Sequence, residues 1–427
     1  MSKGSYPTKH QRNALILSII PGLGQLYHKQ YLKGISFLVL AASFFIVFRD
    51  LLNMGLWGLI TLGEKPFRDH SVFLLVEGIL ALIVVVFGLG FYLFNLRDAY
   101  KNGQKRDEGE RLSNIKEQYR NLIDNGFPYL IMSPGFLLLV FVVIFPILFV
   151  VLLAFTNYDL YHSPPAKLVD WVGFKNFLDI FKIDIWRQTF FSVLGWTLVW
   201  TFVATTFQVA LGVFLAIIVN QKDVKGKAII RTVFILPWAV PAFVSILVFA
   251  GMFNETFGTI NKDIIAFFGI EPIKWMTEPL YTRIALIMIQ SWLGFPFIFA
   301  MTTGVLQSIP EELYEAATVD GASSFQKFKN ITLPLVLFAT APILITQYTF
   351  NFNNFNLIYL FNGGGPALPG SNAGGTDILI SWIYRLTMTS AQYSKAAAIT
   401  MLLSLIVISV ALWQFKRTKS FQEEDMM

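Results

Sequence analysis

The sequence contains no cysteine, which excludes disulfides, thiol nucleophiles and cysteine-based metal sites. Its four histidines lie far apart and show no metal-ligand spacing, so we predict no metal site. Charged residues are also scarce, at 14% of the 427 residues, whereas an average soluble domain has about 25%. So few charges indicate that most of the surface does not face water.

Signature motifs of several enzyme classes are missing as well. No phosphate-binding loop of the form GxxxxGKS or GxxxxGKT occurs, so the chain is not expected to bind ATP itself. There is also no HExxH zinc motif, no paired catalytic carboxylates and no nucleophile elbow. We therefore predict no catalytic residues and no cofactor, and we expect any ATP to be used by separate partner subunits.

Hydrophobic residues make up 55% of the chain, and they gather in runs near the roughly 20 residues that a membrane-spanning helix needs. Eight such runs occur, at residues 31–48, 72–96, 128–155, 189–219, 229–253, 284–306, 333–361 and 396–413. We therefore predict an all-α integral membrane protein of about eight transmembrane helices. Arg49 and Asp50 interrupt the first run, so residues 51–62 are expected to lie flat at the membrane interface. Residues 14–27 are too short to span, and we expect an interfacial helix or a re-entrant turn there.

Positive charge is distributed unevenly over the segments between these runs. With the N-terminus inside, 21 of the 33 Lys and Arg residues lie in inner segments, and cytoplasmic loops are the ones enriched in these residues. We therefore expect a multi-pass protein of the cell membrane with both termini in the cytoplasm. The net charge of +6 is attributed to loops beside anionic lipid, and no nucleic-acid partner is predicted.

The composition changes near residue 120, within a polar and highly charged stretch. We predict an N-terminal membrane and linker region with two spans, at residues 1–126. A body with six spans follows at residues 127–427, and it contains a long cytoplasmic loop at 308–334.

The sequence of this loop indicates two short helices joined by a sharp turn. Ser308 and Glu311 have the spacing of a capping box. Gly321 can end the first helix in a left-handed conformation, and Ser323 or its neighbour can cap the second. The residues alone leave two interpretations, an ordinary helical loop or an amphipathic knob on the cytoplasmic face.

Eight residues of the loop resemble the EAA loop of ABC importer permeases, with matching spacing throughout. They are Glu315, Ala316, Ala317, Asp320, Gly321, Ile331, Leu333 and Pro334. In that family the loop is the coupling helix, which docks on the ATPase subunit. The resemblance implies an ABC importer type I permease fold.

The body is also similar to one branch of this binding-protein-dependent permease family. The stretches ILPWAVPAFVS at 235–245, SWLGFPF at 291–297 and FNFNNF at 350–355 resemble the larger permease subunit of maltose/maltodextrin importers. The resemblance implies translocation of malto-oligosaccharides into the cytoplasm by alternating access. It also implies three kinds of partner: a second homologous permease subunit, two cytoplasmic ATPase subunits and an extracellular solute-binding lipoprotein.

Two stripes that contain carboxamides lie on single faces of apolar runs, at the helical spacing i, i+3, i+4 and i+7. One is Gln290, Leu293, Gly294 and Phe297, and the other is Gln347, Phe350, Asn351 and Asn354. Carboxamides in hydrocarbon need partners, so both stripes should face the interior of the helix bundle. The residues alone permit hydrogen bonding between helices, or a site where amides bond sugar hydroxyls and phenyl rings stack on a pyranose.

The resemblance favours the sugar site, because the sugar in maltose permeases touches the faces that match these positions. Gly294 would leave room for the sugar ring. Three positions depart from the family pattern, since Gln290 replaces Asn, Phe297 replaces Tyr and Gln347 replaces Ser. These changes alter reach and polarity, so a longer maltodextrin or another oligosaccharide remains open.

An ion-coupled secondary sugar transporter is the alternative function. Such carriers need ionisable groups or broken ion-binding helices inside the membrane, and the body has no acidic residue deep within a span. Glu77 is the one acidic residue well inside a predicted span, but it lies five residues from the start of that span. We therefore expect Glu77 to have an interfacial or structural role.

Overall fold

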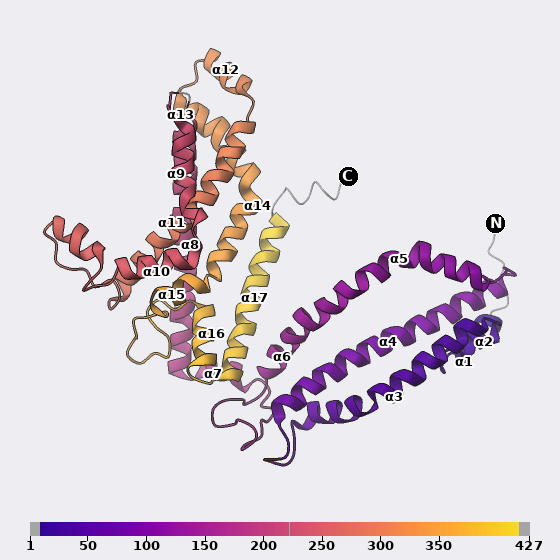
Figure 1. The fold of residues 1–427 in the computed structure, drawn as a ribbon. Coiled ribbons are helices and arrows are strands. Elements are labelled where there is room, and N and C mark those ends of the chain that lie inside the picture. Colours follow the sequence, from indigo (N-terminus) through magenta and orange to yellow (C-terminus); the bar gives the residue numbers. More distant parts are fainter. Residues whose placement is uncertain (1–8, 222, 418–427) are drawn as a thin grey trace. The chain divides into compact units, whose positions relative to one another are not determined.

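The computed structural model describes residues 9–221 and 223–417, which are nearly all helical and contain no strand longer than an isolated bridge. Contacts divide the chain into two compact units, Met1–Gly173 and Phe174–Met427, here called unit 1 and unit 2 (Figure 1). The all-α architecture predicted from the sequence is confirmed. Unit 1 contains the third predicted span together with the first two, whereas the division proposed at residue 126 stays a prediction.

Unit 1 is built on long helices. Its elements are α1 Lys9–Leu17, α2 Leu23–Tyr27, α3 Tyr31–Thr61, α4 Ser71–Asp107, α5 Ile115–Leu139, the π-helix η1 Val140–Ile144 and α6 Phe145–Leu153. Helices α3 and α4 pack through glycines, and a Cβ added to Gly78 would lie 2.6 Å from the Cβ of Leu59. Small residues at such a crossing let membrane helices approach closely. Glu77 lies beside this contact in the second turn of α4 and is partly exposed, and its role stays a prediction.

The first predicted span is longer than the sequence indicated. Helix α3 continues through Arg49 and Asp50 to Thr61, so no separate interfacial segment begins at residue 51. Both charged side chains are exposed on the helix surface. Charged residues do not break a helix as Pro or Gly does, because they keep the backbone hydrogen bond and a helical conformation.

Residues 14–27 comprise the end of α1, a turn at residues 18–22 and the short helix α2, and the two helices fold back onto α4. The carboxylate of Asp107 accepts hydrogen bonds from the backbone amides of His10 (3.0 Å) and the next residue (2.9 Å), near the start of α1. Asn95 accepts a hydrogen bond from the amide of Gly22 (3.1 Å) between the two helices. A carboxylate at a helix N-terminus is favourable because it meets unpaired amides and the positive end of the helix dipole.

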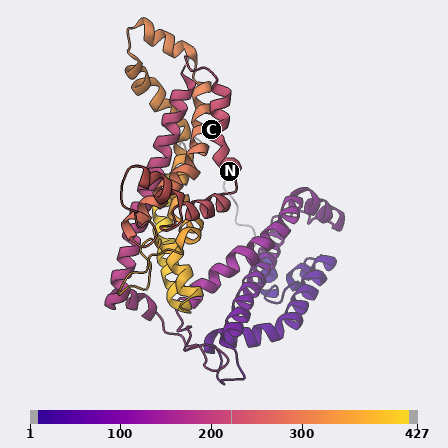
Figure 2. The same ribbon diagram turned by 60° about the vertical axis from the view of Figure 1, so that its left-hand side comes forward.

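Unit 2 consists of a helical core and a projecting loop. Its elements are α7 Lys175–Lys182, α8 Asp184–Asn220, α9 Lys227–Ala239, α10 Ala242–Met252, η2 Ile260–Ile265, α11 Pro279–Ser308, α12 Glu311–Val319, α13 Ser324–Lys327, η3 Phe328–Thr332, α14 Leu333–Phe352, α15 Phe355–Asn362, α16 Leu379–Met388 and α17 Tyr393–Arg417. The buried core gathers around Trp200, Leu286 and Leu357, where α8, α11 and α15 meet. Helices α12 and α13 lie at one end of the unit, and α7 and α16 lie at the other (Figures 1 and 2).

Seven helices among the described residues are long and apolar enough to cross a membrane, and the bent pair α9–α10 would make eight. The prediction of about eight spans is therefore confirmed. The two helices of the pair meet at 89°. Pro241 has no amide hydrogen to continue α9, and Val240 before it is extended, with φ −91° and ψ 132°. The chain therefore leaves the helix and turns at this proline.

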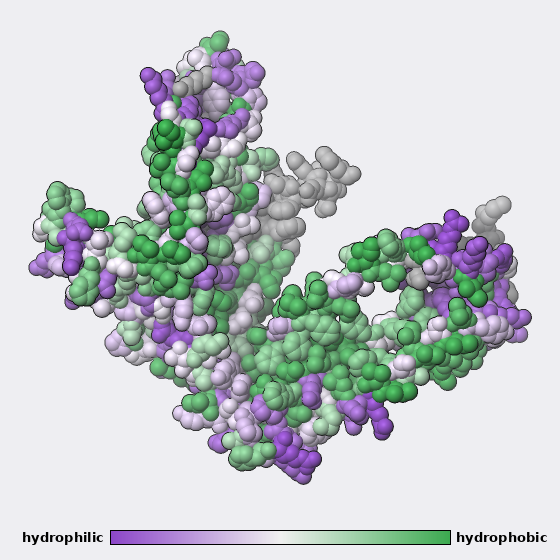
Figure 3. Space-filling model, viewed as in Figure 1, coloured by the Kyte–Doolittle hydropathy of each residue, from purple (hydrophilic) through white to green (hydrophobic). Residues whose placement is uncertain are grey.

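The hydropathy of the surface agrees with a membrane protein. Apolar side chains cover the flanks of the long helices in both units (Figure 3). Polar residues gather around α12 in unit 2 and near the junction of α4 and α5 in unit 1. Apolar flanks with polar tips are the distribution expected where the flanks face lipid and the tips face water.

The loop between α15 and α16 is anchored by a buried carboxylate at the end of unit 2 opposite α12. Asp377 accepts hydrogen bonds from the Gly374 amide (2.7 Å) and the Ser381 hydroxyl (2.8 Å), and it pairs with Arg385 (2.9 Å). Burial raises the pKa of Asp377 above its ordinary value, although these partners favour the charged form. The hydrogen bonds hold the glycine-rich loop 363–375 against the helices.

Candidate substrate site and coupling loop

The four carboxamides of the predicted sugar site meet in one hydrogen-bonded network within unit 2. Asn354 Nδ2 donates to Gln290 Oε1 (2.8 Å) and to Asn351 Oδ1 (3.4 Å). Gln290 Nε2 donates in turn to Gln208 Oε1 (2.9 Å), and Gln208 Nε2 donates to Gln347 Oε1 (3.2 Å). The stripes on α11 and α14 are therefore connected, and Gln208 of α8 lies between them.

Helix α8 supplies two members of this network that the sequence analysis missed. Gln208 is fully buried, and Thr205 one turn before it accepts a hydrogen bond from Asn351 Nδ2 (2.8 Å). Trp200 donates its indole N–H to the backbone oxygen of Asn351 (2.9 Å). The signal that could have found Gln208 is the one used for Gln290, a carboxamide in the middle of an apolar span.

The break between α14 and α15 positions the two asparagines. Helix α14 ends at Phe352, and Asn354 caps α15 by accepting a hydrogen bond from the amide of Leu357 (3.4 Å). Asn is favoured at this position because its side-chain oxygen satisfies an unpaired amide of the first turn. The FNFNNF segment therefore directs Asn351 and Asn354 into the protein, where both are buried.

The eight predicted site residues fall into a buried set and an accessible set. Gln290, Asn351 and Asn354 are buried, whereas Gln347, Leu293, Gly294 and Phe297 are partly exposed and Phe350 is 61% exposed. The accessible set offers one carboxamide among apolar and aromatic side chains. Hydrogen bonding between helices is present in this conformation, and the sugar-binding role stays a prediction.

Gly294 was expected to leave room for a sugar ring, but the space beside it contains Gln208. A Cβ added to Gly294 would lie 2.1 Å from Gln208 Oε1 and 2.6 Å from its Cδ. Helix α8 therefore approaches α11 closely at this point, and the glycine admits the Gln208 side chain.

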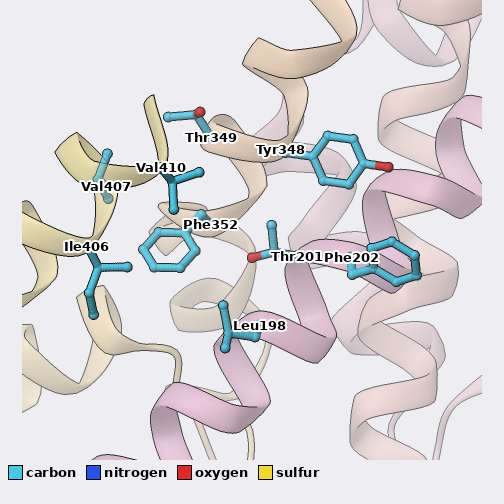
Figure 4. Close-up of a pocket in the computed structure, with 9 residues that line it drawn as sticks. All are labelled: Leu198, Thr201, Phe202, Tyr348, Thr349, Phe352, Ile406, Val407 and Val410. Carbon is cyan, nitrogen blue, oxygen red and sulfur yellow. The ribbon is translucent and has the colours of Figure 1, made fainter. Parts of the chain in front are cut away.

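An apolar cavity of about 230 Å³ lies elsewhere in unit 2, between α8, α14 and α17 (Figure 4). Its lining residues are Leu198, Thr201, Phe202, Tyr348, Thr349, Phe352, Ile406, Val407 and Val410. None of the eight predicted site residues lines it. Tyr348, its most polar ring, already shares a hydrogen bond with Thr206 (3.2 Å). The cavity offers few groups to sugar hydroxyls and is not the candidate substrate site.

Residues 308–334, the predicted coupling loop, form the two short helices that the sequence predicts, α12 and α13. Gly321 between them has φ +77°, the left-handed conformation expected of it. Ser323 and Gln326 form a reciprocal capping box at α13. The box expected at Ser308 does not form, because α11 runs through this residue and its hydroxyl donates to the oxygen of Val305 (2.8 Å).

Helix α12 has no buried residue in unit 2 and exposes Leu313 and Val319. Tyr314 of α12 shares a hydrogen bond with Thr332, with the two hydroxyl oxygens 2.9 Å apart. The predicted coupling residues all lie in this loop or at the start of α14: Glu315, Ala316, Ala317, Asp320, Gly321, Ile331, Leu333 and Pro334. An exposed apolar face on a projecting helix is typical of a surface that a partner covers.

No group of three His, Asp or Glu side chains that could hold a metal ion occurs among residues 9–221 and 223–417. Spanning helices, a polar network among them and a helical loop at one end define a membrane permease subunit.

Sequence comparison identifies the family of this permease. Residues 208–420 match the family described as binding-protein-dependent transport system inner membrane component. The galactooligosaccharides transport system permease protein GanP of Bacillus subtilis is 66% identical over 416 residues, which cover 97% of this chain and all of that protein. The maltodextrin transport system permease proteins MdxF of B. subtilis and MalC of Streptococcus pneumoniae are 52% and 49% identical over 100% and 99% of this chain, and over their full lengths.

A solved structure supports the fold. A bacterial ABC transporter involved in alginate import matches with a TM-score of 0.59 at 20% identity, covering 71% of this chain and 98% of that chain. The chain therefore belongs to the binding-protein-dependent transport system inner membrane component family. The predicted family, the fold class and the role as a non-enzymatic permease subunit of an ABC importer are confirmed.

The contact between Gly294 and Gln208 predicts the effect of a single methyl group. Gly294→Ala should displace the Gln208 carboxamide and break its hydrogen bonds to Gln290 and Gln347. The expected cost is about 1–3 kcal/mol, because buried polar atoms lose their partners. A lower thermal midpoint of the purified protein would measure it. Gly304→Ala on the same helix is the control, since nothing lies within 4 Å of its added Cβ; equal midpoints for the two variants would contradict the prediction.

Proposed function

We propose that this permease subunit carries neutral oligosaccharides across the cell membrane, with the sugar bound against the two stripes of α11 and α14. The observation that carries the proposal is the amide network, which ends at the partly exposed Gln347 and lies on the same helices as Phe297 and Phe350. Carboxamides match hydroxyls as both donors and acceptors, and phenyl rings suit the apolar face of a pyranose.

Two sugar classes are candidates. Malto-oligosaccharides are the sequence-based expectation, and the relatives named for maltodextrin support it. Galacto-oligosaccharides are the second candidate, favoured by the 66% identity to a permease named for them. The higher identity makes the galacto-oligosaccharides the first class to test.

Uptake of labelled sugars tests the function directly. Cells with and without this subunit are given malto- and galacto-oligosaccharides of graded length, and only cells with the subunit should accumulate one of the two classes. Uptake should survive collapse of the proton and sodium gradients and stop when ATP is depleted. Uptake that follows an ion gradient instead would support the secondary-transport alternative.

The proposed transport cycle needs partners. The subunit works with two cytoplasmic ATPase subunits, a second homologous permease and an extracellular solute-binding lipoprotein. The related alginate importer was solved in complex with a sugar-bound periplasmic protein. ATP-driven closure of the ATPases would move α12 and α13, and the sugar cavity would open alternately to the outside and the inside.

The left-handed turn at Gly321 gives a test of coupling. Gly321→Val should strain the turn by about 1–2 kcal/mol, because a β-branched residue tolerates positive φ poorly. No atom lies within 4 Å of the added Cβ, so the backbone alone is affected. We expect the complex to insert but to lose sugar-stimulated ATP hydrolysis. Gly321→Asn is the matched control, since Asn accepts this conformation; normal coupling in the Val variant would remove the argument for the loop.

Removing the two asparagine amides tests the sugar site. Asn351→Ala and Asn354→Ala should each lower transport by about 5- to 150-fold, if a sugar hydroxyl loses a partner worth ~1–3 kcal/mol. Complex yield and uptake per assembled complex are measured together. Asn353→Ala is the control, because Asn353 is exposed and its side-chain Nδ2 group donates only to the backbone oxygen of Thr349. Poor assembly with full uptake per complex would mean that the amides only join helices.

The expected orientation is tested with introduced cysteines, which the natural chain lacks. Two variants are used, Glu110→Cys in the exposed segment after α4 and Ala367→Cys in the loop between α15 and α16. The first should resist an impermeant thiol reagent in intact cells and the second should react. The opposite labelling pattern would reverse the topology. Both terminal segments, whose cytoplasmic location is also expected, lie outside the described residues.

A further inference from the structure

Gln208 belongs to neither predicted stripe and bonds a member of each. It lies near the middle of α8 and is fully buried. Its oxygen accepts from Gln290 of α11, and its nitrogen donates to Gln347 of α14. Both ends of the Gln208 carboxamide are thus engaged.

This bonding determines which end of the Gln347 carboxamide is available to another partner. The oxygen of the Gln347 carboxamide is bonded to Gln208, so the Nε2 group is left for other partners. Among the described residues no acceptor bonds this nitrogen, and the Gln347 side chain is partly exposed. Since a carboxamide can present either a donor or an acceptor, the neighbour that binds one end decides what the other end offers.

Gly294 supports a fixed position for Gln208. The 2.1 Å distance from an added Cβ to Gln208 Oε1 shows that α11 leaves space for this side chain. On the other side of the network, the Asn354 oxygen accepts from the backbone amide of Leu357, which can only donate, so Nδ2 of Asn354 is the group that donates to Gln290. The hydrogen-bond directions therefore run in one sense, from Gln290 through Gln208 to Gln347.

We propose that Gln208 is a positioning residue that makes Gln347 a hydrogen-bond donor to the transported sugar. The ligand class that fits is an oligosaccharide with a hydroxyl oxygen free to accept from Gln347 Nε2. Gln208 acts through Gln347 and does not touch the sugar. This inference rests on the proposed sugar-binding function of the same site.

The first experiment uses the purified wild-type transporter complex. Binding of the transported disaccharide is compared with its monodeoxy and monofluoro analogues, because fluorine can accept a hydrogen bond but cannot donate one. At one hydroxyl the deoxy analogue should bind about 5-fold more weakly, equal to ~1 kcal/mol for one hydrogen bond, while the fluoro analogue stays within about 2-fold of the parent. Gln347→Met should abolish the deoxy penalty at that hydroxyl.

The second experiment changes Gln208 itself. Gln208→Met keeps the approximate size of the side chain and removes both hydrogen bonds. The Gln347 carboxamide is then free to turn and can present its oxygen as well as its nitrogen. An aminodeoxy analogue at the same hydroxyl, whose ammonium donates but does not accept, should therefore bind to the variant complex about 5-fold better, relative to the parent sugar, than it does to the wild-type complex. Thr340→Val on α14 is the control, because Thr340 is buried but bonds only the oxygen of Val336 in its own helix.

Three outcomes would overturn the proposal. A Gln208→Met complex with lower yield but an unchanged ratio of aminodeoxy-analogue to parent affinity would mean that Gln208 only joins helices. If the Gln208→Met complex does not assemble, the binding measurements on the wild-type complex still test the proposal. Equal losses of affinity for the fluoro and deoxy analogues, at the hydroxyl that depends on Gln347, would mean that Gln347 presents its oxygen to the sugar. No sugar binding by the wild-type complex would overturn the proposed function, and this inference with it.

Discussion

Polar groups in hydrocarbon must find partners inside the protein, and this constraint organises unit 2. Water is not available at the middle of a membrane to satisfy a carboxamide. Gln208, Gln290, Gln347, Asn351 and Asn354 bond one another, which leaves Nε2 of Gln347 open, and in doing so they join α8, α11, α14 and α15 at one place. The network therefore fixes how these helices cross as well as the chemistry at the candidate site.

The same helices connect the network to the coupling loop. Helix α11 contains Gln290 and ends at Ser308, where the loop begins. Helix α14 begins at Leu333, where the loop ends, and contains Gln347 and Asn351. A displacement of α12 by an ATPase would therefore act on both walls of the candidate site through continuous helices. A movement of the loop reaches the amides along α11 and α14 without an intermediate element, although each helix contains one proline on the way, Pro296 and Pro342.

The spans could be predicted because long apolar runs admit few other structures, and α4 at Ser71–Asp107 contains the predicted run 72–96. The 89° bend at Pro241 could not, since proline marks a break but tertiary packing sets the angle. The stripes on α11 and α14 were visible from their spacing. Gln208 is an isolated carboxamide in its span, and its partner Gln290 lies 82 residues away, so only the folded chain reveals the pair.

Gly294 shows why the chemistry of the site needed the structure. A glycine beside carboxamides fits two arrangements, space for a ligand or close approach of a neighbouring helix, and here α8 fills the space with Gln208. In this conformation the candidate site has a buried layer of carboxamides that bond one another and a partly exposed layer that a ligand would reach first. Glucose and galactose units differ in the direction of one hydroxyl. Under the proposed sugar-binding role, Gln347 held by Gln208 would offer a donor in one direction and so favour the sugar whose hydroxyl oxygen lies there, whereas a carboxamide free to turn would bond either sugar.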